Sequence, residues 1–344
     1  MKRKQSIHDL AKELSLSATT ISFVLNGKAA EKRISNGVKE KVLAHVKKTG
    51  YQTNMVAKSL RTGKTKIIGM LVEDISDPFF SSIARVIEEN AYKLGYKIFN
   101  SSTENDTTRA KDLIKVFRER QVDGYIIAPA PGTEDEIQQL VDDNLPVILF
   151  DRYFPDLATH NIIVDNAGGS YQAMQHFIEN GYRTIGFVTL DSEQVQMQER
   201  LNGYLRGVAE NKLKPFIQKV PYNTAHNKIV EKVTAFLKKN KGLDSILFAT
   251  NYLAIGGLEA LKNLQLNIPG NIAVIGFDDN THFSLFSPSV TAVAQPVEEM
   301  SAKVMEQLIL CINDENRKTK NITIRLPTKL VIRESSLGKN GIEK

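Results

Sequence analysis

The chain from residue 66 onward alternates short apolar runs with stretches of helical periodicity, and it does so in two successive series. The first series contains "KIIGMLVE", "YKIFNSS", "VDGYIIAP" and "LPVILFD", and the second contains "NIIVD", "YRTIGFVTL", "DSILFAT" and "IAVIGFDD". Apolar strands that alternate with helices form parallel sheets covered on both faces. We therefore expect an α/β core of two similar Rossmann-like lobes. No G-x-G-x-x-G follows the first strand, which disfavours a dinucleotide cofactor.

The segment that precedes this core differs from it in charge. Residues 1–66 carry 15 Lys and Arg against 4 Asp and Glu, a net charge of +11, whereas residues 67–344 carry 30 against 35, a net charge of −5. Such clustering favours a polyanionic partner such as nucleic acid. A solvated basic tail would show the same composition, so the residue pattern has to decide between them.

The basic segment has the pattern of three short helices. A capping-box pattern, Ser6-x-x-Asp9, precedes an apolar stripe over residues 7–14, a second stripe covers residues 18–25, and a third lies between Ser35 and Gly50. Because a three-residue turn joins the first two helices, the segment is predicted to be an all-α helix-turn-helix head. Together with its charge, this favours nucleic acid over a solvated tail.

One aromatic residue lies on the unexpected side of the second helix. Ile21, Val24 and Leu25 recur at helical spacing and should face a core, which turns Phe23 outward. Phe23 is then either a base-contacting residue in a DNA groove or a residue that packs against the loop before the third helix. The sequence alone leaves both interpretations open.

Several classes of protein are disfavoured. No apolar run approaches the roughly 18 residues needed to cross a bilayer, and the N-terminus does not resemble a signal peptide, so a cytoplasmic protein is expected. The single Cys311 lies in an apolar helical run and is expected to be a buried thiol. No metal-ligand spacing of Cys or His, phosphate loop or nucleophile-base pair is visible, so we expect no metal, no cofactor and no enzymatic activity.

Polar side chains follow several of the predicted strands, where ligands bind in doubly wound sheets. They are Asp74, Ser76, Asp77, Asp151, Arg152, Asn251, Asp278 and Asp279, and Phe79 and Phe80 stand beside them. Any one strand-end Asp is more often a helix cap or a turn residue than a ligand. Their convergence, with aromatic faces nearby, favours a small polyol or sugar over an apolar ligand.

The sequence resembles the lactose/galactose repressor (LacI/GalR) family of bacterial transcription regulators over nearly its whole length. The segments that carry the resemblance are "SIHDLAKELSLSATTISFVLNGK", "GYQTNMVAKSLRTGKTKIIGMLVEDISDPFF", "PVILFDR", "VDNAGGS", "QERLNGY", "NIAVIGFDD" and "VTAVAQP", in the family's order. The resemblance implies a DNA-binding head at residues 1–53, a hinge at 54–65, a periplasmic-binding-protein-like effector core at 66–338 and a tail at 339–344.

For the head, the resemblance implies a recognition helix at residues 18–25 in the major groove of operator DNA. The residues implied to read bases are Ala18, Thr19 and Phe23, those implied to contact phosphates are Ser6, His8, Thr20, Ser22 and Asn26, and those of the hinge are Lys58 and Leu60. Leu60 would insert into the minor groove, whereas a flexible linker is the alternative. Ser15 stands where the family usually has Gly, and the loop 27–35 is longer than usual.

For the core, the resemblance implies an N-lobe of residues 66–164 and 294–325 and a C-lobe of residues 165–292 and 326–338. The implied effector contacts are Asp77, Phe79, Phe80, Asp151, Arg200, Tyr222, Asn251 and Asp278, with Tyr222 as a stacking residue. Arg200 would supply a five-donor fork between the lobes; the alternative is a surface ion pair with Glu199 or nearby acids.

These expectations combine into one functional hypothesis. The chain is predicted to be a ligand-responsive repressor of carbohydrate uptake or catabolism genes that binds a palindromic operator as a homodimer, with a sugar-like effector between its lobes. A periplasmic sugar receptor would instead carry an export signal and lack the basic head. A sugar-processing enzyme with a fused DNA-binding head would need catalytic groups that the sequence does not show.

Overall fold

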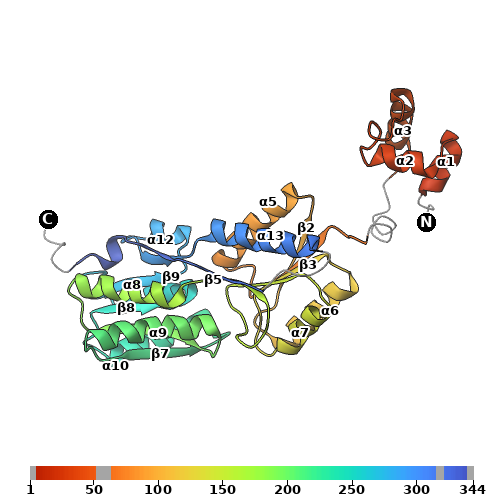
Figure 1. The fold of residues 1–344 in the computed structure, drawn as a ribbon. Coiled ribbons are helices and arrows are strands. Elements are labelled where there is room, and N and C mark those ends of the chain that lie inside the picture. The colour runs from red at the N-terminus through yellow and green to blue at the C-terminus, as the bar shows by residue number, and fades with distance from the viewer. Residues whose placement is uncertain (1–4, 52–62, 315–320, 339–344) are drawn as a thin grey trace. The chain divides into compact units, whose positions relative to one another are not determined.

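The computed structural model describes residues 5–51, 63–314 and 321–338. It consists of two compact units, Met1–Thr65 and Lys66–Lys344, which are drawn in red to orange and in orange to blue in Figure 1.

The first unit is a three-helix head formed by α1 (Ile7–Leu14), α2 (Ala18–Leu25) and α3 (Asn36–Thr49). The predicted capping box is present at α1: the Ser6 backbone N–H donates to the Asp9 carboxylate over 2.8 Å, and the Asp9 N–H donates to the Ser6 hydroxyl over 3.2 Å. The small core comprises Leu10, Leu14, Ile21, Val24, Ala29 and Val42. The helix-turn-helix prediction is confirmed.

The N-lobe of the second unit is a parallel sheet in the order β11-β5-β4-β3-β1-β2. Its strands are β1 (Ile67–Val72), β2 (Lys97–Ser102), β3 (Gly124–Ile127), β4 (Val147–Phe150), β5 (His160–Val164) and β11 (Thr323–Leu326). One face is covered by α5 (Pro78–Lys93) and α13 (Val297–Asn313), and the other by α6 (Thr107–Glu119) and α7 (Glu134–Asp142). The central strands β1, β3, β4 and β5, which are near-continuously apolar, therefore have both faces buried, whereas the edge strands β2 and β11 are partly exposed.

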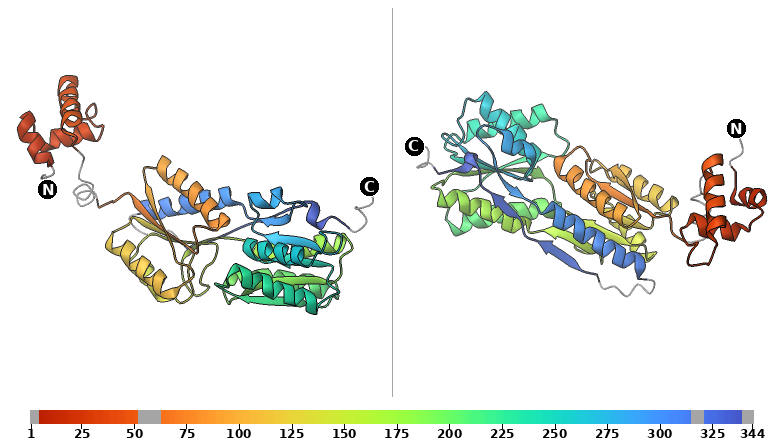
Figure 2. Two further views of the ribbon diagram at one scale, coloured as in Figure 1. Left: turned by 180° about the vertical axis from the view of Figure 1, so that it is seen from behind. Right: turned by 90° about the horizontal axis from the view of Figure 1, so that it is seen from above.

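The C-lobe, drawn mainly in green to light blue in Figure 2, repeats this architecture. Its strands lie in the order β12-β10-β9-β8-β6-β7. Its strands are β6 (Ile185–Asp191), β7 (Phe216–Pro221), β8 (Ser245–Phe248), β9 (Ala273–Phe277), β10 (Thr291–Ala294) and β12 (Lys329–Val331). Its helices are α8 (Asn166–Glu179), α9 (Val195–Glu210), α10 (His226–Lys239), α11 (Asn251–Asn263), α12 (Thr281–Leu285) and the short η1 (Glu334–Ser336). β12 runs antiparallel to β10, whereas β11 runs parallel to β5. The prediction of two Rossmann-like lobes is confirmed.

In the described part of the core the chain crosses between the lobes three times: between β5 and α8, between β10 and α13, and between β11 and β12. We call these the first, second and third crossings. Ala294 pairs with Lys329 in the C-lobe sheet, and Leu326 pairs with Val164 in the N-lobe sheet. These backbone ladders extend the C-lobe from residue 292 to residue 294 at the second crossing, and the N-lobe from residue 325 to residue 326 at the third.

Two further observations bear on the sequence expectations. No helix within the described ranges is long and apolar enough to cross a bilayer. Cys311 lies on α13 against the N-lobe core but is half-buried rather than fully buried, and the burial raises the pKa of its thiol. An elevated thiol pKa lowers the thiolate fraction, so this residue has the character of a packing thiol.

Candidate DNA-reading helix and interlobe ligand site

The exposed side of α2 carries the side chains that the sequence assigns to DNA. Ile21 and Val24 are buried in the head, Thr19 and Asn26 are exposed, and Ala18, Thr20, Ser22 and Phe23 are half-buried. On α1, His8 is exposed, as is its N-cap Ser6. The helix therefore buries the predicted apolar stripe and leaves a polar surface with one aromatic side chain.

Several of the expected phosphate contacts also have partners within the head. The Ser6 hydroxyl donates to Asp9 over 2.7 Å. Ser17 caps α2 by accepting from the Thr20 N–H over 3.0 Å, and the two hydroxyl oxygens lie 2.8 Å apart. The Asn26 amide donates to the Ser22 carbonyl over 2.7 Å. These bonds fix side-chain orientation before DNA is bound, so less rotamer entropy remains to be lost on binding.

Phe23 contacts the loop that precedes α3. The Lys32 ammonium lies 5.6 Å from the centroid of the Phe23 ring, within cation–π range, and also pairs with Glu31 over 2.9 Å. Among the described residues, the apolar cluster of the head and the side chains packed on it do not include Phe23. The ring is thus held by the long loop, not by the core.

The turn after α1 departs from the family pattern. Ser15, in place of the usual Gly, adopts the left-handed conformation at the end of α1, with φ 53° and ψ 42°. Lys58 and Leu60, the predicted hinge contacts, lie outside the described residues.

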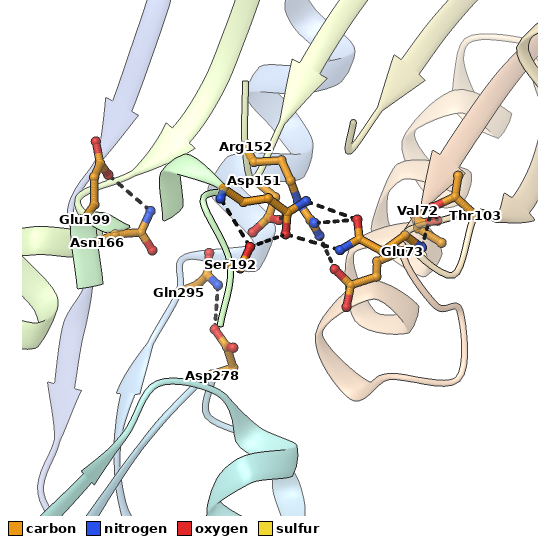
Figure 3. A network of polar contacts seen from close by, with 12 residues as sticks. Val72, Glu73, Thr103, Asp151, Arg152, Asn166, Ser192, Glu199, Asp278 and Gln295 are labelled. Atoms are coloured by element: carbon orange, nitrogen blue, oxygen red, sulfur yellow. Dashed lines mark hydrogen bonds and ion pairs between the residues drawn. The ribbon is translucent and has the colours of Figure 1, made fainter. Parts of the chain in front are cut away.

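In the core, the strand ends of the N-lobe form a buried cluster around Arg152 (Figure 3). Arg152, which is 3% exposed, donates through Nε to Asp151 over 2.9 Å. One terminal nitrogen donates to Asn105 over 3.2 Å and the other to Glu73 over 2.5 Å. Burial by itself lowers the pKa of Arg152, but the charges of Glu73 and Asp151 outweigh it and raise the pKa. The guanidinium is therefore permanently charged and neutralised by its neighbours.

Arg200, on α9, has the corresponding place in the C-lobe. Its side chain is 2% exposed and donates to Asn166 over 2.9 Å, to the Ala249 carbonyl over 2.6 Å and to Asp278 over 3.2 and 3.4 Å. Its guanidinium carbon lies 3.7 Å from the centroid of the Phe277 ring. The alternative of a surface ion pair with Glu199 or nearby acids is wrong, because Arg200 is buried and pairs with the buried Asp278, while Glu199 pairs with Arg325 over 3.0 Å.

The acidic partners of the two arginines share an unusual backbone conformation. Asp151 has φ 65° and Asp278 has φ 68°, both left-handed. A non-glycine residue pays for this conformation and retains it where the surroundings hold it in place. Burial raises the pKa of Asp278, while Arg200 and the amide of Gln295, which donates over 2.6 Å, counteract the shift.

Asp77 brings the N-lobe into contact with this group. It caps α5 by accepting from the Phe79 N–H over 2.8 Å. Burial, together with the negative charge of Asp278, raises the pKa of Asp77 to about 6, although hydrogen bonds from Phe79 and Asn251 oppose the shift. Asn251, at the start of α11, is 2% exposed. Residues from both lobes therefore converge at this point.

The aromatic residues divide into two groups. Phe79 and Phe80 are packed in the N-lobe core, with ring centroids 5.0 Å apart, and Arg152 lies over Phe80 at 5.9 Å. Tyr222 and Tyr252, from the C-lobe, are half-buried, and burial together with the charge of Glu73 raises the pKa of both hydroxyls. The phenylalanines therefore have a packing role that the sequence did not predict.

The sequence reasoning overlooked several residues of the site. They are Glu73, Asn105, Asn166, Gln194, Tyr252 and Gln295. Asn105 and Gln194 exchange two hydrogen bonds, of 3.2 and 3.0 Å, between the lobes. Most of these side chains stand within three residues after a strand, so the strand-end rule would have found them had it been applied after every strand. By contrast, Asp74 only closes a turn with Ser76, and Asp279 pairs with Arg333.

Known proteins share the sequence pattern of this chain. Residues 174–336 match the periplasmic binding protein-like domain family. The chain is 30% identical to the HTH-type transcriptional regulator RegA of Clostridium saccharobutylicum, over 96% of this chain and 99% of RegA. It is 28% identical to catabolite control protein A of Priestia megaterium, over 96% and 99% of the two chains.

Solved structures of transcription regulators share the fold of this chain. A periplasmic binding protein/LacI transcriptional regulator from Alkaliphilus metalliredigens, complexed with D-xylulofuranose, is 28% identical, with a TM-score of 0.72 over 79% of this chain and 100% of the other. The Lac repressor dimer bound to operator and an anti-inducer shares the fold, with a TM-score of 0.85 and 22% identity over 98% and 100% of the chains.

A helix-turn-helix head joined to a two-lobed, periplasmic-binding-protein-like core defines a ligand-responsive transcription regulator. The chain belongs to the LacI family of transcription regulators, the family to which the sequence resemblance pointed. Its relatives are regulators rather than enzymes, and this chain is likewise a regulator without an enzymatic role.

Proposed function

We propose that this regulator represses genes of carbohydrate uptake or catabolism in the cytoplasm, where its DNA target lies. It binds a palindromic operator as a homodimer through α2, and a sugar-like effector binds between its lobes. The observation that carries the effector half is the convergence of Asp77, Asn251 and Asp278 from opposite lobes. The names of its relatives support this assignment, since they include a ribose operon repressor and a CelR–cellobiose complex.

The charges of the site indicate the kind of sugar. All three guanidinium nitrogens of Arg152 and all three of Arg200 already donate to protein groups. Glu73, Asp77 and Asp278 meanwhile supply carboxylate oxygens, and Asp77 and Asp278 oppose one another's ionisation. Such a site is matched by hydroxyl donors, not by a phosphate or carboxylate. We therefore propose a neutral sugar over a sugar phosphate.

Effector binding and DNA binding are connected through the lobes. Closure of two lobes around a ligand changes the angle between them. In a dimer that angle sets the spacing of the two heads, and the spacing of operator half-sites is rigid. A small rotation of one lobe is therefore sufficient to change operator affinity.

The DNA half is tested by selecting bound sequences from a random pool with the full chain. We expect a palindromic site whose affinity falls steeply with salt, because phosphate neutralisation releases counterions. Deletion of residues 1–60 should abolish DNA binding while the sugar-induced thermal shift survives. Unchanged DNA affinity after the deletion would refute the assignment of the head.

Phe23 provides a sharper test within the same selection. A phenylalanine in the groove makes apolar contact, best with a thymine methyl, whereas an arginine pairs with guanine. We expect Phe23→Arg to shift one symmetric position in each half-site from thymine toward guanine, while Lys32→Ala serves as a control that removes only the loop partner. Identical operators for Phe23→Arg and the wild type would show that Phe23 is purely structural.

The effector half is tested by a thermal-shift screen of neutral sugars, each paired with its phosphate ester. Arg200→Ala and Asn251→Ala should both abolish the shift given by the sugar that binds. Arg206→Ala, an exposed position on the same helix, should retain it. A shift that persists in both site variants would remove these residues from the site, and stronger shifts with phosphate esters would contradict the proposed neutral ligand.

A further inference from the structure

A continuous series of polar contacts passes through all three crossings between the lobes. At the second crossing, the Gln295 amide donates to Asp278 over 2.6 Å, and Asp278 accepts from Arg200 over 3.2 Å. Arg200 in turn donates to Asn166, at the first crossing, over 2.9 Å. We call this series, together with its continuation to Arg325, the crossing relay.

The relay continues from Asn166 to the third crossing. The Asn166 amide donates to Glu199 over 3.4 Å (Figure 3), and Glu199 accepts from Arg325 through both carboxylate oxygens, each over 3.0 Å. Arg325 lies on β11, directly before the chain enters the C-lobe. Arg200 and Glu199, which are neighbours on α9, both bond to Asn166. From there Arg200 leads to the second crossing and Glu199 leads to the third.

The inner part of the relay is shielded from water. Asn166 is 1% exposed, Asp278 is 8% exposed and Gln295 is 9% exposed. Hydrogen bonds in such surroundings are strong and costly to leave unmade. The outer pair is different, since the side chains of Glu199 and Arg325 are 20% and 40% exposed. An exposed ion pair contributes little by itself, so its importance rests on the carboxylate that it shares with Asn166.

Backbone contacts tie the first and third crossings to each other. The Asp165 N–H donates to the Leu326 carbonyl over 2.8 Å, and the Thr328 hydroxyl donates to the Asp165 carbonyl over 3.5 Å. The second crossing is bonded to these two through the side chains of Asp278 and Gln295 as well as through the pairing of β10 with β12. A change at Asp278 therefore reaches all three connections.

We propose that Asn166 and Glu199 are positioning residues that transmit the state of the Arg200–Asp278 pair to all three crossings. Neither residue is required to touch the effector. The role rests on the proposed function, because it takes Arg200 and Asp278 as effector contacts. A ligand hydroxyl that donates to Asp278 competes with Arg200 and Gln295, and the relay converts this competition into a change of restraint at every crossing. The backbone at the three crossings is then loosened or restrained together.

The test is amide hydrogen exchange of the full chain, measured in peptides that cover the three crossings, residues 162–168, 292–297 and 324–329. Asn166→Asp keeps the acceptor for Arg200 but sets a second carboxylate against Glu199. Loss of one hydrogen bond of this kind should accelerate exchange by about fivefold, and we expect the acceleration in all three peptides. A merely local structural role would accelerate only residues 162–168.

A second substitution restores the contact with reversed polarity. In the double variant Asn166→Asp/Glu199→Gln, the new amide donates to the new carboxylate, so exchange should return to within about twofold of the wild type. Glu210→Gln is the matched control: it removes a carboxylate from the same helix, at an exposed pair with Arg206. It should leave the three peptides unchanged.

Each outcome decides the proposal. Acceleration confined to residues 162–168, failure of the double variant to restore slow exchange, or an equal effect of Glu210→Gln would overturn it. Should Asn166→Asp fail to fold, Arg325→Gln removes the exposed end of the relay and should accelerate all three peptides by about twofold. Unchanged exchange in that variant also overturns the proposal. Because neither DNA nor sugar is present, failure here is distinct from failure of the proposed function.

Discussion

The two lobes place an aspartate at the same point of the same fold but support it in different ways. Asp151 follows β4 and Asp278 follows the equivalent strand β9, and both adopt a left-handed backbone conformation. In the N-lobe the partner is Arg152, the next residue of the chain. In the C-lobe it is Arg200, from a helix that packs against α8.

This difference determines what each ion pair can sense. Arg152 is held within its lobe by Asp151 and Glu73, and its contact with Asn105 leads to Gln194 at the opposite lobe. Arg200 is held by Asn166, at a crossing, so its position depends on how the lobes are connected. The repeated fold thus contains two equivalent Asp–Arg pairs. They differ because Arg152 comes from the same strand end as Asp151, whereas Arg200 comes from α9.

The strongest test of the comparison removes each arginine in turn. Arg200→Met leaves the Asp278 carboxylate buried without its cation, and Arg152→Met does the same to Asp151. Each should destabilise the core by about 3–5 kcal/mol, measured by urea unfolding. Only Arg200→Met should also accelerate hydrogen exchange at all three crossings. Equal exchange patterns in the two variants would remove the distinction between the pairs.

The next test moves the helix that carries Arg200 without changing any polar group. A Cβ at Gly203 would lie 2.2 Å from the backbone oxygen of Ala167, which belongs to α8 and cannot rotate away. Gly203→Ala should therefore displace α9 and cost about 1–3 kcal/mol of stability. Gly242→Ala, where no atom lies within 4 Å of the new Cβ, is the control and should be neutral. A neutral Gly203→Ala would show that the α8–α9 contact does not position Arg200.

A third test concerns the electrostatic repulsion between Asp77 of the N-lobe and Asp278 of the C-lobe. The pKa of Asp77 is raised to about 6 from 3.8, so the folded state binds the proton more tightly, and stability falls as pH rises from about 4 to 6. Asp77→Asn retains the cap on α5 and should stabilise the core at pH 7 by about 1–2 kcal/mol after discounting the shift for solvent screening.

This gain should disappear below pH 4, as followed by thermal unfolding across the pH range. Asp278→Asn removes one cause of the shift and should weaken the pH dependence that Asp77 contributes. A stability difference between Asp77→Asn and the wild type that does not change between pH 4 and 7 would contradict the raised pKa of Asp77. It would show that the charge of Asp278 does not affect the ionisation of Asp77.

The smallest expected effect comes from a substitution at Ser15, which measures how much a left-handed backbone conformation costs without an ion pair. That cost can then be compared with the effect of glycine at Asp151 and Asp278. Ser15 adopts the same left-handed conformation in the head, where its backbone N–H donates to the carbonyls of Ala11 and Lys12. Ser15→Gly should relieve the strain and stabilise the head by up to about 1 kcal/mol, measured by slower hydrogen exchange of residues 10–20. Asp151→Gly and Asp278→Gly should instead destabilise the core, because each loses an ion pair. A stabilising glycine at either position would mean that strain outweighs the ion pair there.

Much of the site was within reach of the sequence, because strand ends and helix starts are set by local patterns. Asp151, Asn251 and Asp278 were placed by the rule that ligands bind at the carboxyl ends of parallel strands, and the structure brings them together with Asp77 and Arg200. The rule was not applied after the strand that ends at Ala294, so it overlooked Gln295, whose amide completes the environment of Asp278. The packing of Phe79 and Phe80 was overlooked because an aromatic residue at a strand end gives no signal of which side it faces.

The sequence by itself determined the three-helix head, the two α/β lobes and the family, because helix caps, apolar periodicity and charge segregation act over a few residues at a time. The tertiary structure alone decided the partners of Arg152 and Arg200, the contact of Phe23 with Lys32, and the connection of three crossings through Asn166 and Glu199. Most of these contacts join residues that are distant in sequence, and the contact of Phe23 with Lys32 joins a helix to the loop that follows it. Their geometry depends on how helices and strands pack, which no local pattern encodes.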